Sequence, residues 1–183
     1  MPRLIGIAGK AGAGKDTAAD YLCTMWGFTK ISFADPLKKA AEHMFGLKRD
    51  YFHDRSLKEQ VVKIWGMSPR RMLQILGNDA TKPFFGEDLW LKRFLITYQP
   101  IAMSEDVVVP DVRFNLEAEA IRAQGGTILH LTRNTGGLSG DAAAHASESG
   151  VMKVSGDMLI SNESSVEDLY AGLDMLLGEP IER

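Results

Sequence analysis

A glycine-rich segment near the N-terminus constrains the fold of this chain more than any other feature. It occupies residues 9–17, reads GKAGAGKDT and follows an apolar run at residues 4–8. A glycine, four further residues and then Gly-Lys is the spacing of a phosphate-binding loop that joins a strand to a helix. The glycines let the backbone curl until successive N–H groups face one anion, and the following helix adds its N-terminal amides. The segment therefore predicts a binding site for a nucleoside triphosphate.

Three polar side chains end this loop. Lys15 is expected to place its charge beside the β- and γ-phosphates. The next position usually carries the serine or threonine that binds Mg²⁺, whereas here it carries Asp16, and Thr17 comes one residue later. Mg²⁺ accepts both kinds of oxygen, directly or through water, so which of the two serves the metal is left open. Asp16 is equally well interpreted as an acidic residue that stabilises the first turn of a helix. The predicted nucleotide-contacting residues of the loop are Gly9, Lys10, Ala11, Gly12, Ala13, Gly14, Lys15, Asp16 and Thr17.

Hydrophobic patterns predict the rest of the architecture. Short β-rich runs alternate with longer runs of helical period, which indicates an α/β fold with a parallel sheet covered by helices. Pro110 is expected to end its strand at Val109, because proline cannot donate to a ladder. Ser164 and Glu167 have the spacing of a capping box ahead of the last helix. The expected strands are residues 4–8, 28–34, 107–111, 127–132 and 157–161, and the clearest helices are 15–26, 37–45 and 166–177.

Two stretches depart from this alternation within the single domain expected over residues 1–183. Residues 46–100 carry helical patterns at 57–65, 69–76 and 87–98 without a convincing strand, which predicts a helical insertion beside the sheet. Residues 134–150 hold four glycines, three serines and only one large apolar residue, Leu138. Such a weakly cored segment predicts either a surface loop or a mobile lid.

The composition excludes several classes of partner. The chain has 183 residues and a formal net charge of −3, so no bulk charge draws it to nucleic acid or to an anionic membrane. Its single cysteine, Cys23, excludes an internal disulfide and a multi-cysteine metal site, and indicates a reducing compartment. No apolar run reaches the roughly 18 residues that a membrane span needs. These observations predict a cytoplasmic protein that holds any anion in a local site.

Six segments, the end of the phosphate-binding loop among them, are informative together, and each except that loop is weak alone. In chain order they are GKDT at 14–17, SFADPLK at 32–38, RMLQILGND at 71–79, FGEDLW at 85–90, DVRFNLEA at 111–118 and HASE at 145–148. Together they resemble the phage-type deoxynucleoside monophosphate kinases. The resemblance implies a P-loop kinase three-layer fold with a five-stranded parallel sheet, a helical acceptor-binding insertion and a mobile lid. It also implies transfer of the ATP γ-phosphoryl group, with Mg²⁺, to a deoxynucleoside 5′-monophosphate in the cytoplasm, that of the host if the chain is viral.

Charged residues at the ends of the expected strands are candidates for catalysis, because phosphoryl transfer needs placement and charge neutralisation. Asp111 is a candidate to support Mg²⁺ through water, and Arg113 can reach toward the phosphates, although the two also fit a plain surface ion pair. Arg133 stands at the base of the expected lid and completes a catalytic set with Lys15 and Arg113. Asn162 follows the last expected strand, at a position that resembles the family's loop near the donor base. It is equally well interpreted as an asparagine that forms a turn.

The acceptor is expected to bind in the insertion and the lid. Arg71 and Gln74 share one helix face, which can offer a guanidinium to a phosphate and an amide to a base edge. Asp35, followed by Pro36, is either a carboxylate on the acceptor side or a helix cap. Trp90 is either an aromatic platform under the base or a core residue. The predicted acceptor-binding residues are Asp35, Arg70, Arg71, Gln74, Trp90, His145 and Glu148.

Two other functions are compatible with the sequence. One is a P-loop kinase of another small acceptor, such as dephospho-coenzyme A, and the other is a nucleotide-binding regulatory module with slow ATP hydrolysis. A GTPase-type switch is disfavoured because the chain has no Asn-Lys-x-Asp element. The expected partners are small nucleotides, with no nucleic acid and no membrane. The sequence leaves open whether the chain forms a homodimer, which bases it accepts and whether it excludes ribonucleotides.

Overall fold

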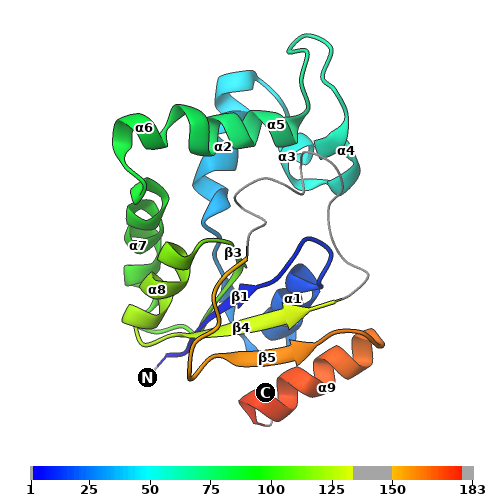
Figure 1. The fold of residues 1–183 in the computed structure, drawn as a ribbon, viewed down its shortest axis with the longest axis vertical. Coiled ribbons are helices and arrows are strands. Elements are labelled where there is room, and N and C mark those ends of the chain that lie inside the picture. Colours follow the sequence, from blue (N-terminus) through cyan, green and yellow to red (C-terminus); the bar gives the residue numbers. More distant parts are fainter. Residues whose placement is uncertain (1, 134–149, 179–183) are drawn as a thin grey trace. The chain divides into compact units, whose positions relative to one another are not determined.

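The computed structural model describes residues 2–133 and 150–178, and Figure 1 shows their path. The chain forms two compact units. The first, called here the sheet unit, combines Met1–Ser32 with Ile96–Arg183, and the second, called the helical unit, is the continuous segment Phe33–Leu95. The insertion expected at residues 46–100 overlaps the helical unit without sharing its bounds.

A five-stranded parallel sheet forms the centre of the sheet unit, which confirms the predicted fold class. Its strands are β1 (Leu4–Ala8), β2 (Thr29–Lys30), β3 (Val107–Val112), β4 (Thr127–Thr132) and β5 (Met158–Ser161), in the order β2-β3-β1-β4-β5. β1 is buried along its whole length, as its unbroken apolar run predicts for a central parallel strand. The prediction of a strand over residues 28–34 is wrong in length, because the ladder of β2 ends where Lys30 pairs with Val108 and the chain enters a helix at Ala34.

The prediction that β3 ends at Val109 is also wrong. The strand continues through Pro110 to Val112 because its ladder with β1 contains an irregularity there. Gly6 pairs with Val109 but Ala8 pairs with Val112, so two residues of β3 stand opposite one residue of β1. Such a bulge accommodates a residue that has no N–H to donate. On the other side the ladder with β2 has already ended, so no donor is needed at Pro110.

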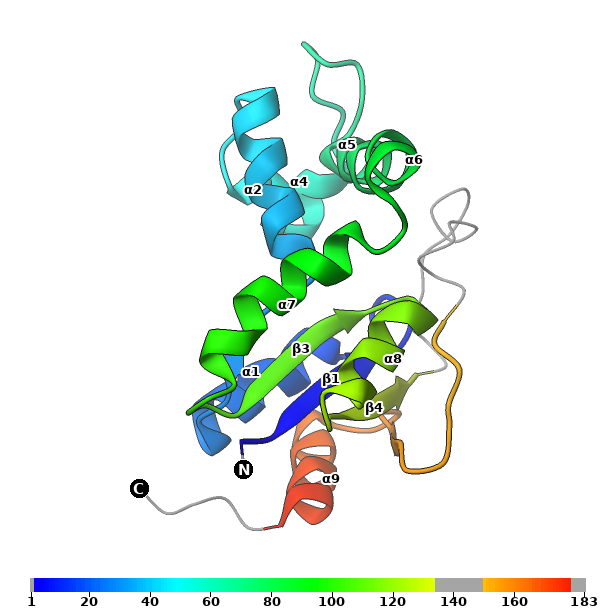
Figure 2. The ribbon, with the colours of Figure 1, turned by 90° about the vertical axis from the view of Figure 1, so that its left-hand side faces the viewer.

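Helices cover both faces of the sheet. α1 (Lys15–Trp26) and α9 (Val166–Leu177) share a core with β4 on one face, built around Leu22, Leu129 and Leu173. α8 (Asn115–Ala123) covers the other face, where a Cβ at Gly6 would lie 2.6 Å from Ile121 Cδ1. Figure 2 shows α8 in front of the sheet and α1 behind it. The sheet unit therefore has the three layers that the sequence predicts.

The ends of these helices follow the expected chemistry with one exception. α1 spans the predicted residues and ends at Gly27, whose φ of 72° is the left-handed conformation that glycine favours. α9 also has the predicted bounds, but its capping box is shifted by one residue. Ser165 Oγ accepts from the Asp168 amide at 3.1 Å, and Asp168 Oδ2 accepts from the Ser165 amide at 3.2 Å. The predicted box of Ser164 and Glu167 is therefore wrong.

The helical unit contains short helices around a small core of Ala41, Phe52 and Met72. The expected helix at 57–65 is wrong beyond Glu59, since the chain then forms an isolated antiparallel bridge between Val62 and Met67. The expected helix at 69–76 is extended by a π-helical turn. The elements are α2 (Ala34–Phe45), α3 (Asp50–His53), α4 (Arg55–Glu59), α5 (Pro69–Gln74), the π-helix η1 (Ile75–Ala80), α6 (Lys82–Phe85) and α7 (Leu89–Ile101), which continues into the sheet unit.

Two further expectations from the sequence concern a lid and membrane-spanning helices. The predicted lid, residues 134–150, lies outside the described residues except for Gly150. Across residues 2–133 and 150–178, every helix is too short or too polar to cross a bilayer.

Candidate active site

The loop between β1 and α1 has the backbone conformation that its glycines predict. Gly9, Gly12 and Gly14 have φ angles of 152°, 81° and 98°. A Cβ at Gly9 would lie 2.4 Å from the carbonyl oxygen of Leu131. A Cβ at Gly14 would lie 2.5 Å from the side-chain nitrogen of Asn162, Nδ2. Larger residues are therefore excluded at both positions. Because Gly14 is the N-cap of α1, the loop runs directly into the amides at the positive end of that helix.

The ammonium group of Lys15 folds back over the start of the loop. Its Nζ donates to the carbonyl oxygen of Gly9 at 2.7 Å and to that of Lys10 at 2.9 Å. The side chain is half-buried. A positive charge is thereby held where the loop curls, close to any anion that the loop amides bind.

Asn162 holds the phosphate-binding loop through a side-chain hydrogen bond. Its side chain is buried, with 6% of the residue exposed, and its Nδ2 donates to the carbonyl oxygen of Ala13 at 2.9 Å. Its backbone N–H donates to Thr132 O at 2.8 Å, which ties the end of β4 to the same place. These bonds give Asn162 a role in holding the loop. A direct contact between Asn162 and the donor nucleotide stays a prediction.

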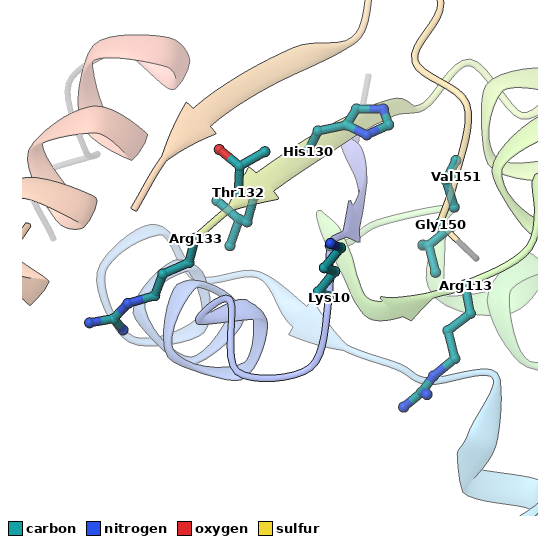
Figure 3. A pocket seen from close by; sticks show the side chains of 10 residues that line it. Lys10, Arg113, His130, Thr132, Arg133, Gly150 and Val151 are labelled. Carbon is teal, nitrogen blue, oxygen red and sulfur yellow. The ribbon is translucent and has the colours of Figure 1, made fainter. Parts of the chain in front are cut away.

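A cavity of about 300 Å³, called here the loop cavity, opens beside the phosphate-binding loop (Figure 3). Three of its lining side chains are cationic, and in Figure 3 Lys10 lies between Arg113 and Arg133. The structure thus brings the two predicted catalytic arginines to one cavity with the loop. Several cations around one cavity favour a polyanionic ligand. The lining residues are Gly9, Lys10, Val112, Arg113, His130, Leu131, Thr132, Arg133, Gly150 and Val151.

The candidate magnesium ligands are separate oxygen donors. Asp111 lies near the end of β3, where its Oδ2 accepts a hydrogen bond from Ser32 Oγ at 2.5 Å. Asp16 is exposed and Thr17 half-buried in the first turn of α1. Among the described residues, no three His, Cys, Asp or Glu side chains gather as a metal-binding group. Mg²⁺ is usually bound by one or two protein oxygens, with water and phosphate completing its shell, so this donor set fits it.

Glu117 fixes the backbone around Arg113. It is the third residue of α8, is only 9% exposed, and its Oε2 accepts from the amides of Arg113 at 2.7 Å and Phe114 at 3.1 Å. Burial raises the pKa of the Glu117 carboxyl to about 7, the charge of Asp111 adds to this, and the two backbone hydrogen bonds oppose it. The carboxyl therefore couples the start of α8 to the chain that carries Arg113.

Five predicted acceptor residues lie in the helical unit. Arg70 Nε pairs with Glu59 Oε1 at 2.6 Å, and Arg71 Nη1 lies 3.6 Å from Asp79 Oδ2. Arg71 lies in the first turn of α5, as predicted, where Ser68 Oγ accepts from its amide at 3.4 Å, and Gln74 ends the same helix. The ligand-binding roles of these residues stay predictions.

The other two acceptor candidates of this unit have clear structural partners. Trp90 Nε1 donates to the carbonyl oxygen of Gly77 at 2.8 Å. Asp35 does not cap α2, because that helix begins at Ala34 and Asp35 lies in its first turn, 3.5 Å from Lys38 Nζ. The capping interpretation of Asp35 is therefore wrong. His145 and Glu148 lie outside the described residues.

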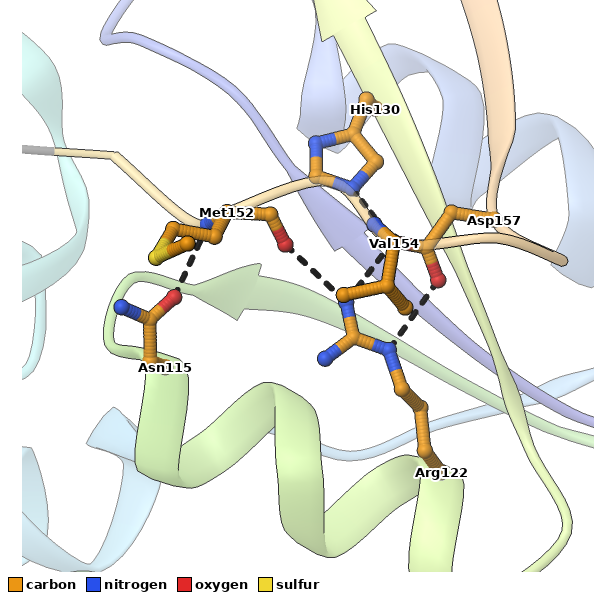
Figure 4. Close-up of polar contacts among 6 residues, drawn as sticks. All are labelled: Asn115, Arg122, His130, Met152, Val154 and Asp157. Carbon is orange, nitrogen blue, oxygen red and sulfur yellow. Dashed lines mark hydrogen bonds and ion pairs between the residues drawn. The ribbon is translucent and has the colours of Figure 1, made fainter.

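Sequence reasoning missed a polar network behind the loop cavity. It contains His130 of β4, Arg122 of α8 and Asp157, which directly precedes β5 (Figure 4). The one available signal was a histidine inside an otherwise apolar strand, because the partners are too far away in sequence to be paired by spacing.

A glycine loop between a central parallel strand and a helix, with cations gathered beside it, defines a P-loop nucleotide-binding protein of the kinase type. A family model described as deoxynucleotide monophosphate kinase matches residues 47–173. A relative from Acanthamoeba polyphaga mimivirus is 34% identical over 181 residues, covering 92% of both chains. The deoxynucleotide monophosphate kinase of Enterobacteria phage T4 is 27% identical over 234 residues, covering 92% of this chain and 96% of its own. The chain belongs to the deoxynucleotide monophosphate kinase family.

Solved structures with little sequence similarity share the fold alone. The structure of TT1252 from Thermus thermophilus matches with a TM-score of 0.55 at 21% identity, covering 96% of both chains. Dephospho-CoA kinase from Campylobacter jejuni matches with a TM-score of 0.53 at 16% identity, also covering 96% of both chains.

Proposed function

We propose that this protein transfers the γ-phosphoryl group of ATP to a deoxynucleoside 5′-monophosphate and so forms the diphosphate. The observation that carries the proposal is the loop cavity, in a chain of the deoxynucleotide monophosphate kinase family. A phosphate-binding loop, a lysine folded over it and two arginines line or adjoin one cavity. Phosphoryl transfer requires groups of this kind, since the reaction depends on positioning the nucleotides and on neutralising the charge of their phosphates.

The donor nucleotide is assigned to the loop. The amides of the loop and of the first turn of α1 bind its phosphates, and Lys15 exchanges its carbonyl partners for phosphate oxygens. Arg113 and Arg133 neutralise the charge that spreads over the transferring group. Because the acceptor phosphate is already ionised, no residue is required to act as a general base.

Asp16, Thr17 and Asp111 are the residues assigned to hold Mg²⁺. The ion supplies positive charge to the triphosphate oxygens when it is bound. The Ser32 hydroxyl orients the Asp111 carboxylate for this role by donating to one of its oxygens.

The acceptor nucleotide is assigned to the helical unit. There Arg70 and Arg71 offer guanidinium groups to its phosphate, Gln74 offers an amide to its base edge, and Asp35 and Trp90 complete the site. His145 and Glu148 are further candidates from the expected lid. A location in the cytoplasm, that of a host cell if the chain is viral, is part of the proposal and is supported by the phage and viral origin of the named relatives.

The decisive experiment is an acceptor screen with product identification. The purified protein is given ATP, Mg²⁺ and, in separate reactions, each deoxynucleoside monophosphate and each ribonucleoside monophosphate. Formation of ADP together with a deoxynucleoside diphosphate is expected. ATP hydrolysis that ignores every added monophosphate, or transfer only to dephospho-coenzyme A, would contradict the proposal.

Lys15→Ala is expected to reduce turnover by about 10²-fold or more, because one preorganised charge at the transferring phosphates is removed. The fold should stay intact, since the lysine ammonium bonds to carbonyl oxygens of the loop rather than to the buried core. Turnover and circular dichroism measure the two effects. Lys39→Ala, which removes an exposed lysine of α2, is the control and should behave as the wild type.

A further inference from the structure

His130 is a polar residue in the interior of a parallel sheet. On β4 it pairs with Ala8 of β1 and Leu159 of β5, and its side chain is only 12% exposed. Such positions ordinarily carry apolar side chains, and an imidazole buried there without a partner is costly. The exposed part of His130 lines the loop cavity together with Lys10, Arg113 and Arg133. The position therefore combines burial with access to the proposed phosphate site.

The partner of His130 is a carboxylate that accepts four hydrogen bonds (Figure 4). Asp157 Oδ2 lies 3.0 Å from His130 Nε2, and the Asp157 side chain is only 2% exposed. Arg122 binds both carboxylate oxygens, Nε to Oδ1 at 3.0 Å and Nη2 to Oδ2 at 2.7 Å. The amide of Val154 donates to Oδ2 at 2.9 Å. Asp157 is thus held rigidly on the side of His130 away from bulk water.

This environment determines which proton His130 carries. Burial alone would raise the pKa of the Asp157 carboxyl, but the hydrogen bonds from Arg122, Val154 and His130 and the charge of Arg122 outweigh burial and hold it well below its usual range. An ionised carboxylate can only accept, so His130 Nε2 must be the donor. When the ring also carries a proton on Nδ1, that nitrogen can donate to a second anion.

The same network fixes the wall of the cavity next to His130. Arg122 Nη2 donates to the carbonyl oxygen of Met152 at 3.2 Å, and the Met152 amide donates to Asn115 Oδ1 at 2.8 Å. Gly150 and Val151, which directly precede Met152, line the loop cavity. Asp157 and Arg122 therefore position two parts of the wall at once, the His130 ring and the segment that begins at residue 150.

We propose that His130 binds a phosphate group in the loop cavity and that Asp157, fixed by Arg122, is its positioning residue. The inference rests on the proposed function, because the phosphate is taken to belong to the donor nucleotide. Among the residues that the structure describes, the charged groups near the ring include Asp157 and its partner Arg122, and Lys10, Arg113 and Arg133 along the cavity.

His130→Gln tests the contact with phosphate. Glutamine can keep an N–H directed at Asp157, so the midpoint of thermal unfolding should stay close to that of the wild type. It has no second ring nitrogen to donate to the phosphate, so the dissociation constant of the Mg²⁺ complex of adenylyl imidodiphosphate, measured by calorimetry, should rise about tenfold. In the wild type, the analogue should shift the His130 ring ¹⁵N resonances, because a phosphate oxygen comes to lie beside the ring. Unchanged affinity in His130→Gln, or unchanged ring resonances, would overturn the inference.

Asp157→Asn tests the positioning role, with Asp174→Asn as its matched control. Asp174 is also a hydrogen-bonded carboxylate of the sheet unit, accepting from Tyr21 Oη at 2.7 Å and Trp26 Nε1 at 3.0 Å, but it does not line the loop cavity. Both variants should lose stability. Only Asp157→Asn should also weaken binding of the analogue and change the ring resonances that report the Nε2 proton. Equal affinities in the two variants would overturn the role of Asp157.

The kinase assay of the wild type separates this inference from the function on which it rests. Transfer to a deoxynucleoside monophosphate together with unchanged binding in His130→Gln would leave the proposed function standing and remove the role of His130. Failure of the wild type to bind the analogue at all would contradict both.

Discussion

Gly14 occupies a position from which two independent causes exclude a side chain. Its φ of 98° is costly for any L-residue, and a Cβ there would lie 2.5 Å from Asn162 Nδ2. Gly156 has a similar φ of 94°, but a Cβ there would meet nothing within 4 Å. Substitutions at these two glycines therefore separate the effect of backbone strain on stability from the effect of disturbing the phosphate-binding loop.

Gly156→Ala is expected to lower the free energy of unfolding by about 1 kcal/mol and to leave nucleotide affinity unchanged, because it adds only strain. Gly14→Ala should show the same strain and should also weaken nucleotide binding by more than about tenfold, since Asn162 or the loop must move. Chemical denaturation and calorimetric binding measure both quantities. Equal nucleotide affinity in the two variants would show that the Asn162 contact does not hold the loop.

Single residues could be predicted where the chemistry is local. The loop glycines and Lys15 follow from a fixed spacing, because the strand, the curl and the helix N-terminus occupy consecutive residues. The pairing of His130 with Asp157 joins residues 27 apart, and that of Asn162 with Ala13 joins residues 149 apart. Only the register of the sheet brings such residues together, so spacing along the chain gives no sign of these contacts.

At the scale of elements, the N-terminus of α8 combines a helix cap with a titrating group. Glu117 accepts two backbone hydrogen bonds, and its pKa is raised from 4.5 to about 7 chiefly by burial. The native state therefore binds the Glu117 proton more tightly than the unfolded chain does. The stability that this group contributes is present at low pH and is lost as the pH rises from about 4.5 to about 7.

Glu117→Gln is expected to remove this pH dependence. Both amides bind the same oxygen, Oε2, so a single amide carbonyl of glutamine can accept both bonds. Relative to the wild type, the variant should gain on the order of 3 kcal/mol between pH 4.5 and pH 8. Urea unfolding across this range measures the difference. Glu119→Gln, which removes an exposed carboxylate from the same helix, should keep the wild-type profile, and a parallel profile for Glu117→Gln would refute the role of burial.

Elements were predicted well where one face is buried and poorly where a local signal was ambiguous. α1 and α9 have the expected bounds because their apolar residues recur at helical spacing and their ends carry glycine or serine. Ser164 and Ser165 are adjacent, and only the geometry decides which of them caps α9. Pro110 predicted the end of a strand, but the bulge opposite β1 keeps that strand in the sheet.

At the scale of the whole molecule, an acidic chain presents a cationic cavity. The formal net charge is −3, yet three cationic side chains line the loop cavity and Lys15 lies on the adjacent loop. Local charge, not net charge, therefore governs the binding of a polyphosphate. The composition predicted the absence of a basic surface, and the strand-end motifs predicted that Arg113 and Arg133 serve one site. Only the sheet topology shows that Lys10 lines the same cavity as these two arginines.

Affinity for the Mg²⁺ complex of adenylyl imidodiphosphate is expected to fall several-fold as salt rises from about 0.05 to about 0.5 M, despite the negative net charge, because ions screen the cavity cations. Arg133→Gln should bind more weakly and show a shallower dependence on salt. Lys39→Gln, which changes the net charge by the same amount on α2, should keep the wild-type slope. Titrations at several salt concentrations supply these slopes, and identical slopes in all three proteins would contradict the argument.

The sheet unit combines two segments that are far apart in the sequence, and this limits the order in which a nascent chain can fold. Among the strands that the structure describes, β1 pairs only with β3 and β4, and β2 pairs only with β3, so both lack neighbours until Val107–Val112 has been synthesised. The whole helical unit, Phe33–Leu95, leaves the ribosome during that interval. On a nascent chain, the phosphate-binding loop therefore forms late, although its residues are among the first to be translated.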